Sequence, residues 1–148
     1  MSESENMEPT FISETKRPLV LVIDDDDAIR ASLGELLDDA GFRTIDARHG
    51  LEALDILTTI EELPTFILLD LMMPVMDGWA FCDVRDKSGT LREIPIVAIS
   101  AAPISRSERP AGIDAFMAKP IDLDNFVWLA DRMAGRKRPG HPGTGALH

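Results

Sequence analysis

The residues of this chain that could do chemistry are acids, a lysine and a serine that stand at the ends of short apolar runs. Asp24 and Asp25 follow LVLVI, Asp70 follows FILL, Ser100 follows IPIVAI, and Lys119 follows AFMA. Carboxylates that are held close together repel, by about 4 kcal/mol for a pair ~4 Å apart at an effective dielectric constant of roughly 20. The three acids therefore need a positive partner, and oxygen ligands without histidine or cysteine favour Mg²⁺ or Mn²⁺.

A metal ion, an ammonium group and a hydroxyl group around one further carboxylate are what phosphoryl transfer to that carboxylate needs. Catalysis of such a transfer consists mainly of positioning the groups and neutralising the phosphate oxygens. Asp70 is the candidate nucleophile, and attack by its carboxylate would form an acyl phosphate. This chemistry requires residues up to 95 positions apart (119 − 24) to meet at one place.

Short apolar runs alternate with helical patterns, which is typical of a doubly wound α/β domain with a parallel sheet covered by helices on both faces. The five predicted strands are Leu19–Ile23, Phe42–Ala47, Phe66–Leu69, Ile94–Ile99 and Ala115–Ala118. We expect about five helices, among them one capped by Asp27 that ends at Gly41, others over about Leu51–Ile60 and Trp79–Asp86, and a last one from Asp122. Right-handed crossovers make all strands parallel, so their carboxyl ends meet at one edge, where such domains bind ligands.

Composition bounds the kind of protein further. The 148 residues fit one domain, which we place at residues 18–134 between two tails predicted to be disordered, 1–17 and the basic, Gly- and Pro-rich 135–148. The net charge of −11 argues against binding nucleic acid. A single cysteine, Cys82, and the lack of an apolar run of membrane length favour a cytoplasmic protein that does not insert into membranes.

Four segments of the chain, VLVIDDDDAIR, FILLDLMMPVMDGW, IPIVAISA and DAFMAKPID, together resemble the receiver domain of two-component response regulators. The resemblance covers about residues 18–134 and implies the flavodoxin-like strand order 2-1-3-4-5. It implies that Asp24 and Asp25 bind Mg²⁺, and that Asp70 accepts the phosphoryl group and also binds the metal. The backbone carbonyl of Met72 would be a further ligand.

The resemblance also assigns roles to three residues from the last two strands. Ser100 would hold a phosphate oxygen, and Lys119 would pair with the phosphate. Phe116, three residues before Lys119, falls at the position of the family's switch aromatic, which turns inward when the serine hydroxyl moves toward the phosphate.

A protein of this kind would be a single-domain signalling switch. A histidine kinase or a histidine phosphotransfer protein would be the phosphodonor, and a downstream protein would receive the signal. We expect no separate turnover substrate, because phosphatases with an aspartate nucleophile generally carry a second acid two residues later, where this chain has Met72. The main alternative is an interaction module that has the fold but is not switched by phosphate.

The stretch between Ser100 and Lys119 departs from the family pattern. Its 18 residues (119 − 100 − 1), AAPISRSERPAGIDAFMA, are fewer than the family usually has there, and they include Pro103 and Pro110. Proline inside a helix removes a hydrogen bond and costs ~3 kcal/mol or more. We therefore predict that the fourth helix is shortened or irregular around residues 103–111, in a region that belongs to the family's usual output surface.

Two further features lead to predictions about phosphate lifetime and about contacts. The positions two beyond Asp70 and two beyond Ser100 are Met72 and Ala102, and neither side chain can orient an attacking water, so we predict slow loss of phosphate. On a helical wheel Trp128 points away from the apolar face of the last helix, so we expect it to be exposed, at an interface with a partner or in a homodimer.

Overall fold

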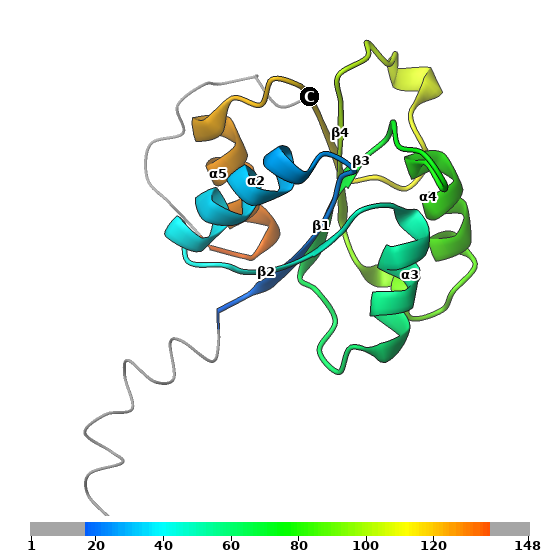
Figure 1. Cartoon of the computed structure of the whole chain (residues 1–148), viewed down its shortest axis with the longest axis horizontal. Coiled ribbons are helices and arrows are strands. Elements are labelled where there is room, and N and C mark those ends of the chain that lie inside the picture. The colour runs from blue at the N-terminus through cyan, green and yellow to red at the C-terminus, as the bar shows by residue number, and fades with distance from the viewer. Residues whose placement is uncertain (1–16, 137–148) are drawn as a thin grey trace, which may run out of the picture.

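A single parallel sheet organises the chain, and the computed structural model describes residues 17–136 of it (Figure 1). The strands are β1 (Leu19–Ile23), β2 (Arg43–Ala47), β3 (Phe66–Asp70), β4 (Ile96–Ser100) and β5 (Ala115–Ala118). They lie in the order β2-β1-β3-β4-β5, and every pair is parallel. The predicted fold class and strand order are therefore confirmed. Residues 1–16 and 137–148, which hold most of the two predicted tails, lie outside the described residues.

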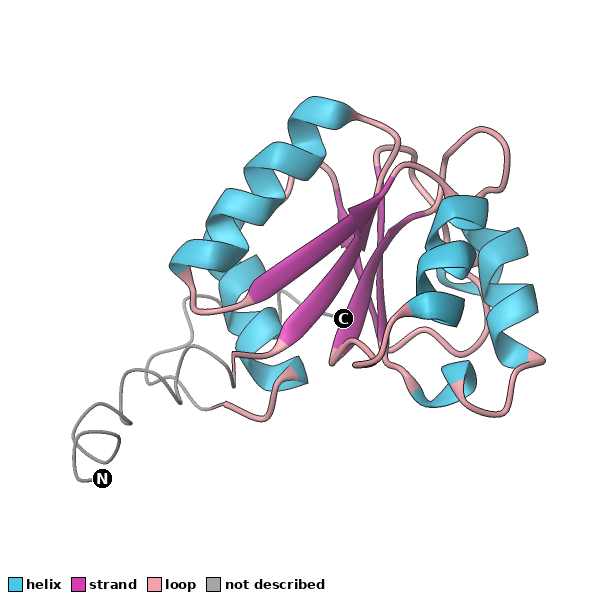
Figure 2. Cartoon of the chain, turned by 60° about the horizontal axis from the view of Figure 1, so that its bottom comes forward, coloured by secondary structure: helices cyan, strands magenta, loops and turns pink. Residues whose placement is uncertain are grey.

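Helices cover both faces of the sheet. They are α2 (Asp27–Asp39), α3 (Gly50–Thr59), α4 (Gly78–Asp86) and α5 (Leu123–Met133), with single 3₁₀ turns η1 (Leu91–Glu93) and η2 (Arg106–Glu108). In Figures 1 and 2, α2 and α5 lie on one face, whereas α3 and α4 lie on the other. The described residues thus form four α-helices instead of about five, and none of these helices is long and apolar enough to cross a membrane.

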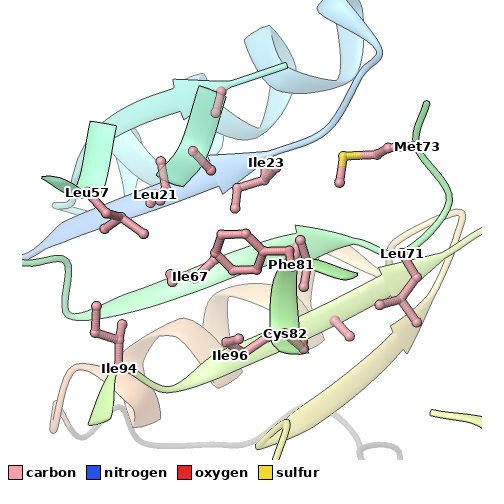
Figure 3. Packing of buried hydrophobic residues seen from close by; sticks show 14 residues of the cluster. Leu21, Ile23, Leu57, Ile67, Leu71, Met73, Phe81, Cys82, Ile94 and Ile96 are labelled. Atoms are coloured by element: carbon pink, nitrogen blue, oxygen red, sulfur yellow. The ribbon is translucent and has the colours of Figure 1, made fainter. Parts of the chain in front are cut away.

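The three central strands are buried along their whole length, because helices pack on both sides of them. Alternate side chains of each strand enter two separate cores. The core under α3 and α4 contains Leu21, Ile67 and Phe81 (Figure 3), and the core under α2 and α5 contains Phe42 and Phe66 as an edge-to-face pair with ring centroids 6.3 Å apart. This packing fixes the register of the strands and thereby the positions of the residues that follow them.

Cys82 belongs to the first of these cores (Figure 3). Burial raises the pKa of its thiol to about 11, so the thiol stays protonated near neutral pH. A protonated, buried thiol is a poor nucleophile, and the residue acts as a small apolar side chain in the packing.

Side-chain acceptors begin each α-helix. In each case the residue just before the helix accepts a hydrogen bond from a backbone amide of the first turn. These residues are Asp26 before α2, His49 before α3, Asp77 before α4 and Asp122 before α5. The sequence analysis expected Asp27 to cap α2, but the cap is Asp26. The difference has a physical reason, since Asp27 already has helical geometry and its side chain pairs with Arg30 one turn later.

The helix expected between β4 and β5, around residues 103–111, is shortened as predicted. Only the 3₁₀ turn η2 lies between these two strands. Side chains of α4 hold this stretch in place of helical hydrogen bonds. The indole Nε1 of Trp79 donates to the carbonyl of Glu108 at 2.8 Å. Arg85, only 3% exposed, donates to the carbonyl of Gly112 in this stretch at 3.3 Å and to the carbonyl of Ile94, just before β4, at 2.9 Å.

Arginines fasten both ends of the described part to the turn between α2 and β2. Arg17 donates to the carbonyl of Phe42 at 2.8 Å, and Arg136 donates to the carbonyl of Gly41 at 2.7 Å. The guanidinium of Arg136 also lies 4.2 Å from the ring centroid of Phe42. The folded unit therefore includes two residues, Gly135 and Arg136, that the sequence analysis assigned to the second tail.

Trp128 is half-buried against the second core, so the prediction that it is exposed is wrong. A helical wheel gives the direction in which a side chain leaves the helix, but not the reach of a large indole ring. The guanidinium of Arg132, one turn later, lies 4.8 Å from the ring centroid and covers part of it. Leu123, the first residue of α5 and an apolar one, is 58% exposed instead. The interface proposed for Trp128 therefore loses the observation on which it was based.

A strained turn follows β3. Val75 has a φ of 69°, and the amide of Met76 donates to the carbonyl of Pro74 at 2.7 Å, which defines a γ-turn with positive φ. This backbone conformation is unfavourable for a β-branched residue. The valine side chain is 70% exposed, so little packing compensates for the strain.

Val75→Gly should raise the free energy of unfolding by about 1 kcal/mol, because strain at a residue with positive φ exceeds the entropy cost of glycine. Urea unfolding followed by circular dichroism measures the change. Val84→Gly is the matched control at an exposed valine inside α4, and it should lower stability by about 0.5 kcal/mol. A loss of stability in Val75→Gly would contradict the assignment of strain to this turn.

Candidate functional site

Three residues that are distant in the sequence meet at the carboxyl end of the sheet. The Nζ of Lys119 lies 2.9 Å from Oδ2 of Asp24 and 3.4 Å from Oδ2 of Asp70. These contacts join positions 95 and 49 residues apart. The predicted convergence of the strand ends is therefore present, and its centre is a lysine between two carboxylates.

The acids of this site are close enough to share one cation. One carboxylate oxygen from each of Asp24, Asp25 and Asp70 lies within 4.8 Å of the other two. Asp24 and Asp70 are buried, at 0% and 3% exposed, whereas Asp25 is exposed to solvent. A set of three carboxylates with one open side suits a hard divalent ion such as Mg²⁺, which keeps several waters when it binds.

Arg30, a residue that the sequence analysis missed, holds the acidic turn in place. Its Nη1 donates to the backbone carbonyl of Asp24 at 2.7 Å, while its other nitrogens bind Asp27 and, at 3.0 Å, Asp46 at the end of β2. The sequence carries only a weak signal for this contact, the spacing of three residues between Asp27 and Arg30. The register that places Asp46 beside Val22 could not be predicted from residue types.

The pKa of Asp70 lies above its ordinary value. Burial is the largest cause, and the negative charge of Asp24 acts in the same direction. The backbone amide of Met72, which donates to Oδ1 at 3.1 Å, and the ammonium of Lys119 oppose the shift without cancelling it. The carboxylate of Asp70 therefore gains from any further positive charge brought to the site.

Lys119 keeps its proton. Burial lowers the pKa of the ammonium, but its hydrogen bond to Asp24 and the charges of Asp24 and Asp70 outweigh burial, so the pKa lies above its ordinary value. The peptide bond between Lys119 and Pro120 is cis. The protonated ammonium of Lys119, held by Asp24 and Asp70, is a fixed positive charge at this edge of the sheet.

Ser100 ends β4 next to the acidic site. It is completely buried, and its Oγ accepts from the amide of Ala102 at 3.1 Å. Strand β4 pairs with β3 so that Asp70 lies opposite Ile99, one residue before the serine. The hydroxyl proton of Ser100 is therefore still available to a group placed near Asp70.

The remaining predicted site residues are Met72, Phe116 and Trp128. The side chain of Met72 is 50% exposed beside Asp70. Phe116 lies on β5 and is half-buried, and the guanidinium of Arg109 covers its ring at 4.1 Å from the centroid. Trp128 lies on α5 in contact with the second core and does not join the cluster. Arg109 gave no signal in the sequence analysis, because its contact depends on the irregular path of residues 101–114.

A doubly wound five-stranded domain with acids and a lysine at its carboxyl edge defines a class of signalling domains. Residues 20–130 match the family described as the response regulator receiver domain. The chain belongs to this family, which has no separate turnover substrate.

Known relatives agree with this assignment. The chain is 36% identical over 124 residues to the response regulator MprA of Mycobacterium tuberculosis, in an alignment that covers 81% of this chain and 52% of MprA. It is 31% identical over 121 residues to the sensor histidine kinase CheAY of Helicobacter pylori, covering 82% of this chain and 15% of that protein. The chain therefore spans about half the length of MprA and a small part of CheAY.

Solved structures share the fold. The receiver domain of the Francisella response regulator 1452 superposes with a TM-score of 0.71 at 27% identity, over 82% of this chain and 100% of that one. The receiver domain of the sensor histidine kinase PA1611 of Pseudomonas aeruginosa PAO1 gives a TM-score of 0.71 at 21% identity, over 80% of this chain and 98% of that one. The PA1611 structure holds a magnesium ion coordinated in its active-site cleft.

Asp70→Asn should raise the free energy of unfolding without divalent ions by on the order of 1 kcal/mol, because the amide removes a buried charge and still accepts from Met72. A carboxyl group whose pKa is raised by folding loses its stabilising contribution as pH rises through that pKa. The difference between variant and wild type should therefore be small in acid and largest near neutral pH.

Urea unfolding across this pH range, with and without Mg²⁺, measures the effect. Mg²⁺ should reduce the difference in unfolding free energy between Asp70→Asn and the wild type, because a ligand of the folded state stabilises the wild type. The control is Asp55→Asn, at an exposed acid on α3, which should change stability little at any pH. If Asp70→Asn is less stable than the wild type near neutral pH without Mg²⁺, this electrostatic description is contradicted.

Proposed function

We propose that this chain is a response regulator that accepts a phosphoryl group on Asp70 from a histidine kinase or a histidine phosphotransfer protein and signals by changing its protein contacts. The observation that carries the proposal is the meeting of Asp70 with Asp24, Asp25 and Lys119 at one edge of the sheet. An interaction module that phosphate does not switch would not need a buried nucleophile held beside a second acid.

The metal site of the proposal consists of Asp24, Asp25, Asp70 and the backbone carbonyl of Met72. The three carboxylates are close enough together for one ion, and the PA1611 receiver domain, which has the same fold, binds magnesium in its cleft. A bound Mg²⁺ would neutralise the acids and the phosphate oxygens that approach them.

Asp70, Lys119 and Ser100 then have different roles in phosphoryl transfer. One Oδ of Asp70 forms a bond to phosphorus while the bond from phosphorus to the donor's imidazole nitrogen breaks, and the imidazole leaves with that electron pair. Lys119 holds its proton and pairs with an oxygen of the transferred group. The hydroxyl of Ser100 donates to another oxygen, which gives Asp70 an acyl phosphate with two fixed donors around it.

A groove beside Lys119 offers a docking place for the donor. It has a volume of about 570 Å³ and lies between α2 and the start of α5, where Ile29, Leu33 and Leu123 line it. Lys119 also lines the groove and contacts Asp70, so a helix seated on this lining would bring a phosphohistidine toward Asp70. The partner that fits this groove is a protein with an exposed apolar helix that carries the phosphohistidine.

Acetyl phosphate with Mg²⁺ should add the mass of one phosphoryl group to the wild type, as read by intact mass spectrometry. Asp70→Asn should remain unmodified, because it lacks the nucleophile. Asp26→Asn is the matched control, since an asparagine keeps the cap of α2 and the acid is outside the proposed metal site. An unmodified wild type that is folded would favour the unswitched interaction module.

The phosphoryl group should be lost slowly, and Met72→Asn should accelerate its loss severalfold. An amide beside Asp70 can orient an attacking water, whereas the half-exposed thioether of Met72 cannot. The decay of the phosphorylated mass over time measures the rate. Val75→Asn places the same amide in the same loop, five residues after Asp70 instead of two, and should leave the rate unchanged. Equal rates in the wild type and Met72→Asn would contradict the proposed cause.

A further inference from the structure

Two arginines line a small pocket at the irregular segment between β4 and β5. Arg106 and Arg109 surround about 280 Å³ together with the apolar side chains of Pro110, Ile113 and Phe116. A pocket of this size takes one or two side chains of a partner. Its cationic lining contrasts with the net charge of −11 of the whole chain.

Neither arginine has a carboxylate partner within the part of the chain that the structure describes. Other arginines there do form ion pairs: Arg17, Arg30, Arg43, Arg48, Arg85 and Arg136. Asp114 also lines the pocket and adds one negative charge to it, but its Oδ1 accepts from the amide of Ile96 at 3.0 Å and it forms no ion pair with either arginine in the described part of the chain. The Nε of Arg109 is buried and has no hydrogen-bond acceptor, which is uncommon for a charged donor in a folded protein.

The contact between Arg109 and Phe116 prepares the guanidinium for a carboxylate. The Cζ of Arg109 lies 4.1 Å from the ring centroid, so the aromatic face holds the cation. An aromatic ring beneath a guanidinium accepts none of its hydrogen bonds, and the N–H groups at the edge can bind both oxygens of one carboxylate. The pocket therefore combines a held cation, a second cation and an apolar lining.

We propose that Arg106 and Arg109, together with Phe116, bind an acidic segment of the downstream partner, and that phosphorylation of Asp70 changes the affinity of this site. The inference rests on the proposed function and specifies the chemistry of the partner. We choose an acidic segment because of charge complementarity. Its carboxylates would pair with both arginines, and a neighbouring apolar side chain would contact the apolar lining. A nucleic acid is disfavoured, since the rest of this acidic protein would repel it.

The fold connects this pocket to the phosphorylation site through one short strand. Phe116 and Lys119 lie three residues apart on and just after β5, and β5 pairs with β4 so that Ser100 lies opposite Ala118. The segment before Phe116 is bound to α4, because the indole Nε1 of Trp79 donates to the carbonyl of Glu108, the residue before Arg109. The backbone at Arg109 is thus anchored to α4, and a movement of Phe116 changes its ring contact with a guanidinium that does not follow it.

The experiment measures fluorescence anisotropy of a short labelled peptide of alternating glutamate and leucine, with a glutamine and leucine peptide as its neutral match. The protein is the full chain, before and after acetyl phosphate and Mg²⁺. We expect phosphorylation to change the affinity for the glutamate peptide, and the glutamine peptide to bind more weakly. Arg106→Gln and Arg109→Gln should each weaken binding of the glutamate peptide by about tenfold or more.

Arg92→Gln is the matched control, because Arg92 is exposed in η1 and likewise has no ion pair in the described region. It should bind the glutamate peptide as the wild type does, and an equal loss in Arg92→Gln would overturn the site in favour of a general charge effect. Arg109→Lys keeps the charge but not the fork of donors, and should lose most of the binding. Binding of a DNA duplex in preference to the peptide would also overturn the proposal.

Nuclear magnetic resonance of the arginine Nε–H groups tests the site in the unaltered chain. Addition of the glutamate peptide should shift the signals of Arg106 and Arg109, and unshifted signals would overturn the proposal. Mass spectrometry of the same samples separates the two proposals. A phosphorylated chain whose peptide affinity equals that of the unmodified chain would overturn only the coupling to Asp70. An unmodified chain that still binds the glutamate peptide through both arginines would contradict only the proposed function.

Discussion

The repulsion between the carboxylates of Asp24 and Asp70 is the constraint on which the site depends. Two such charges about 4 Å apart cost roughly 4 kcal/mol at an effective dielectric constant of ~20, and burial of both residues adds to that cost. Lys119 offsets part of it through contacts of 2.9 and 3.4 Å, yet the pKa of Asp70 remains raised. The folded chain therefore holds an excess of negative charge that a divalent cation would relieve, which couples metal binding to the stability of this edge.

The parallel sheet supplies the rigidity that keeps these charges together. β1 and β3 are buried along their whole length, and their pairing holds Ile23 beside Leu69, so Asp24 and Asp70 leave the sheet as neighbours. The packing of the strands behind them, together with Lys119, holds the two repelling acids this close. The same rows of apolar side chains that stabilise the fold therefore determine the geometry of the site.

Patterns along the chain were sufficient for the strands, their order and the residues at their ends, because burial on two faces leaves continuous apolar runs and the family motifs set the order. Contacts that depend on long side chains were not predictable in this way. Arg30 binds the carbonyl of Asp24, and Arg109 covers Phe116, but both contacts depend on paths of the backbone that residue types do not encode. The burial of Trp128 was misjudged for a related reason, since Arg132 covers its ring.

The stretch between β4 and β5 shows how side chains can replace a helix. Proline at positions 103 and 110 removes helical hydrogen bonds, and the carbonyls of Glu108 and Gly112 in this stretch accept from Trp79 and Arg85 of α4 instead. Each such bond contributes on the order of 1 kcal/mol, but removal of a donor would leave a carbonyl unsatisfied at a larger cost. A segment held at a few points by side chains can change its path by exchanging those contacts, whereas a helix moves as one body. The segment between β4 and β5 is therefore better suited to rearrangement around Phe116 than to displacement of a rigid helix.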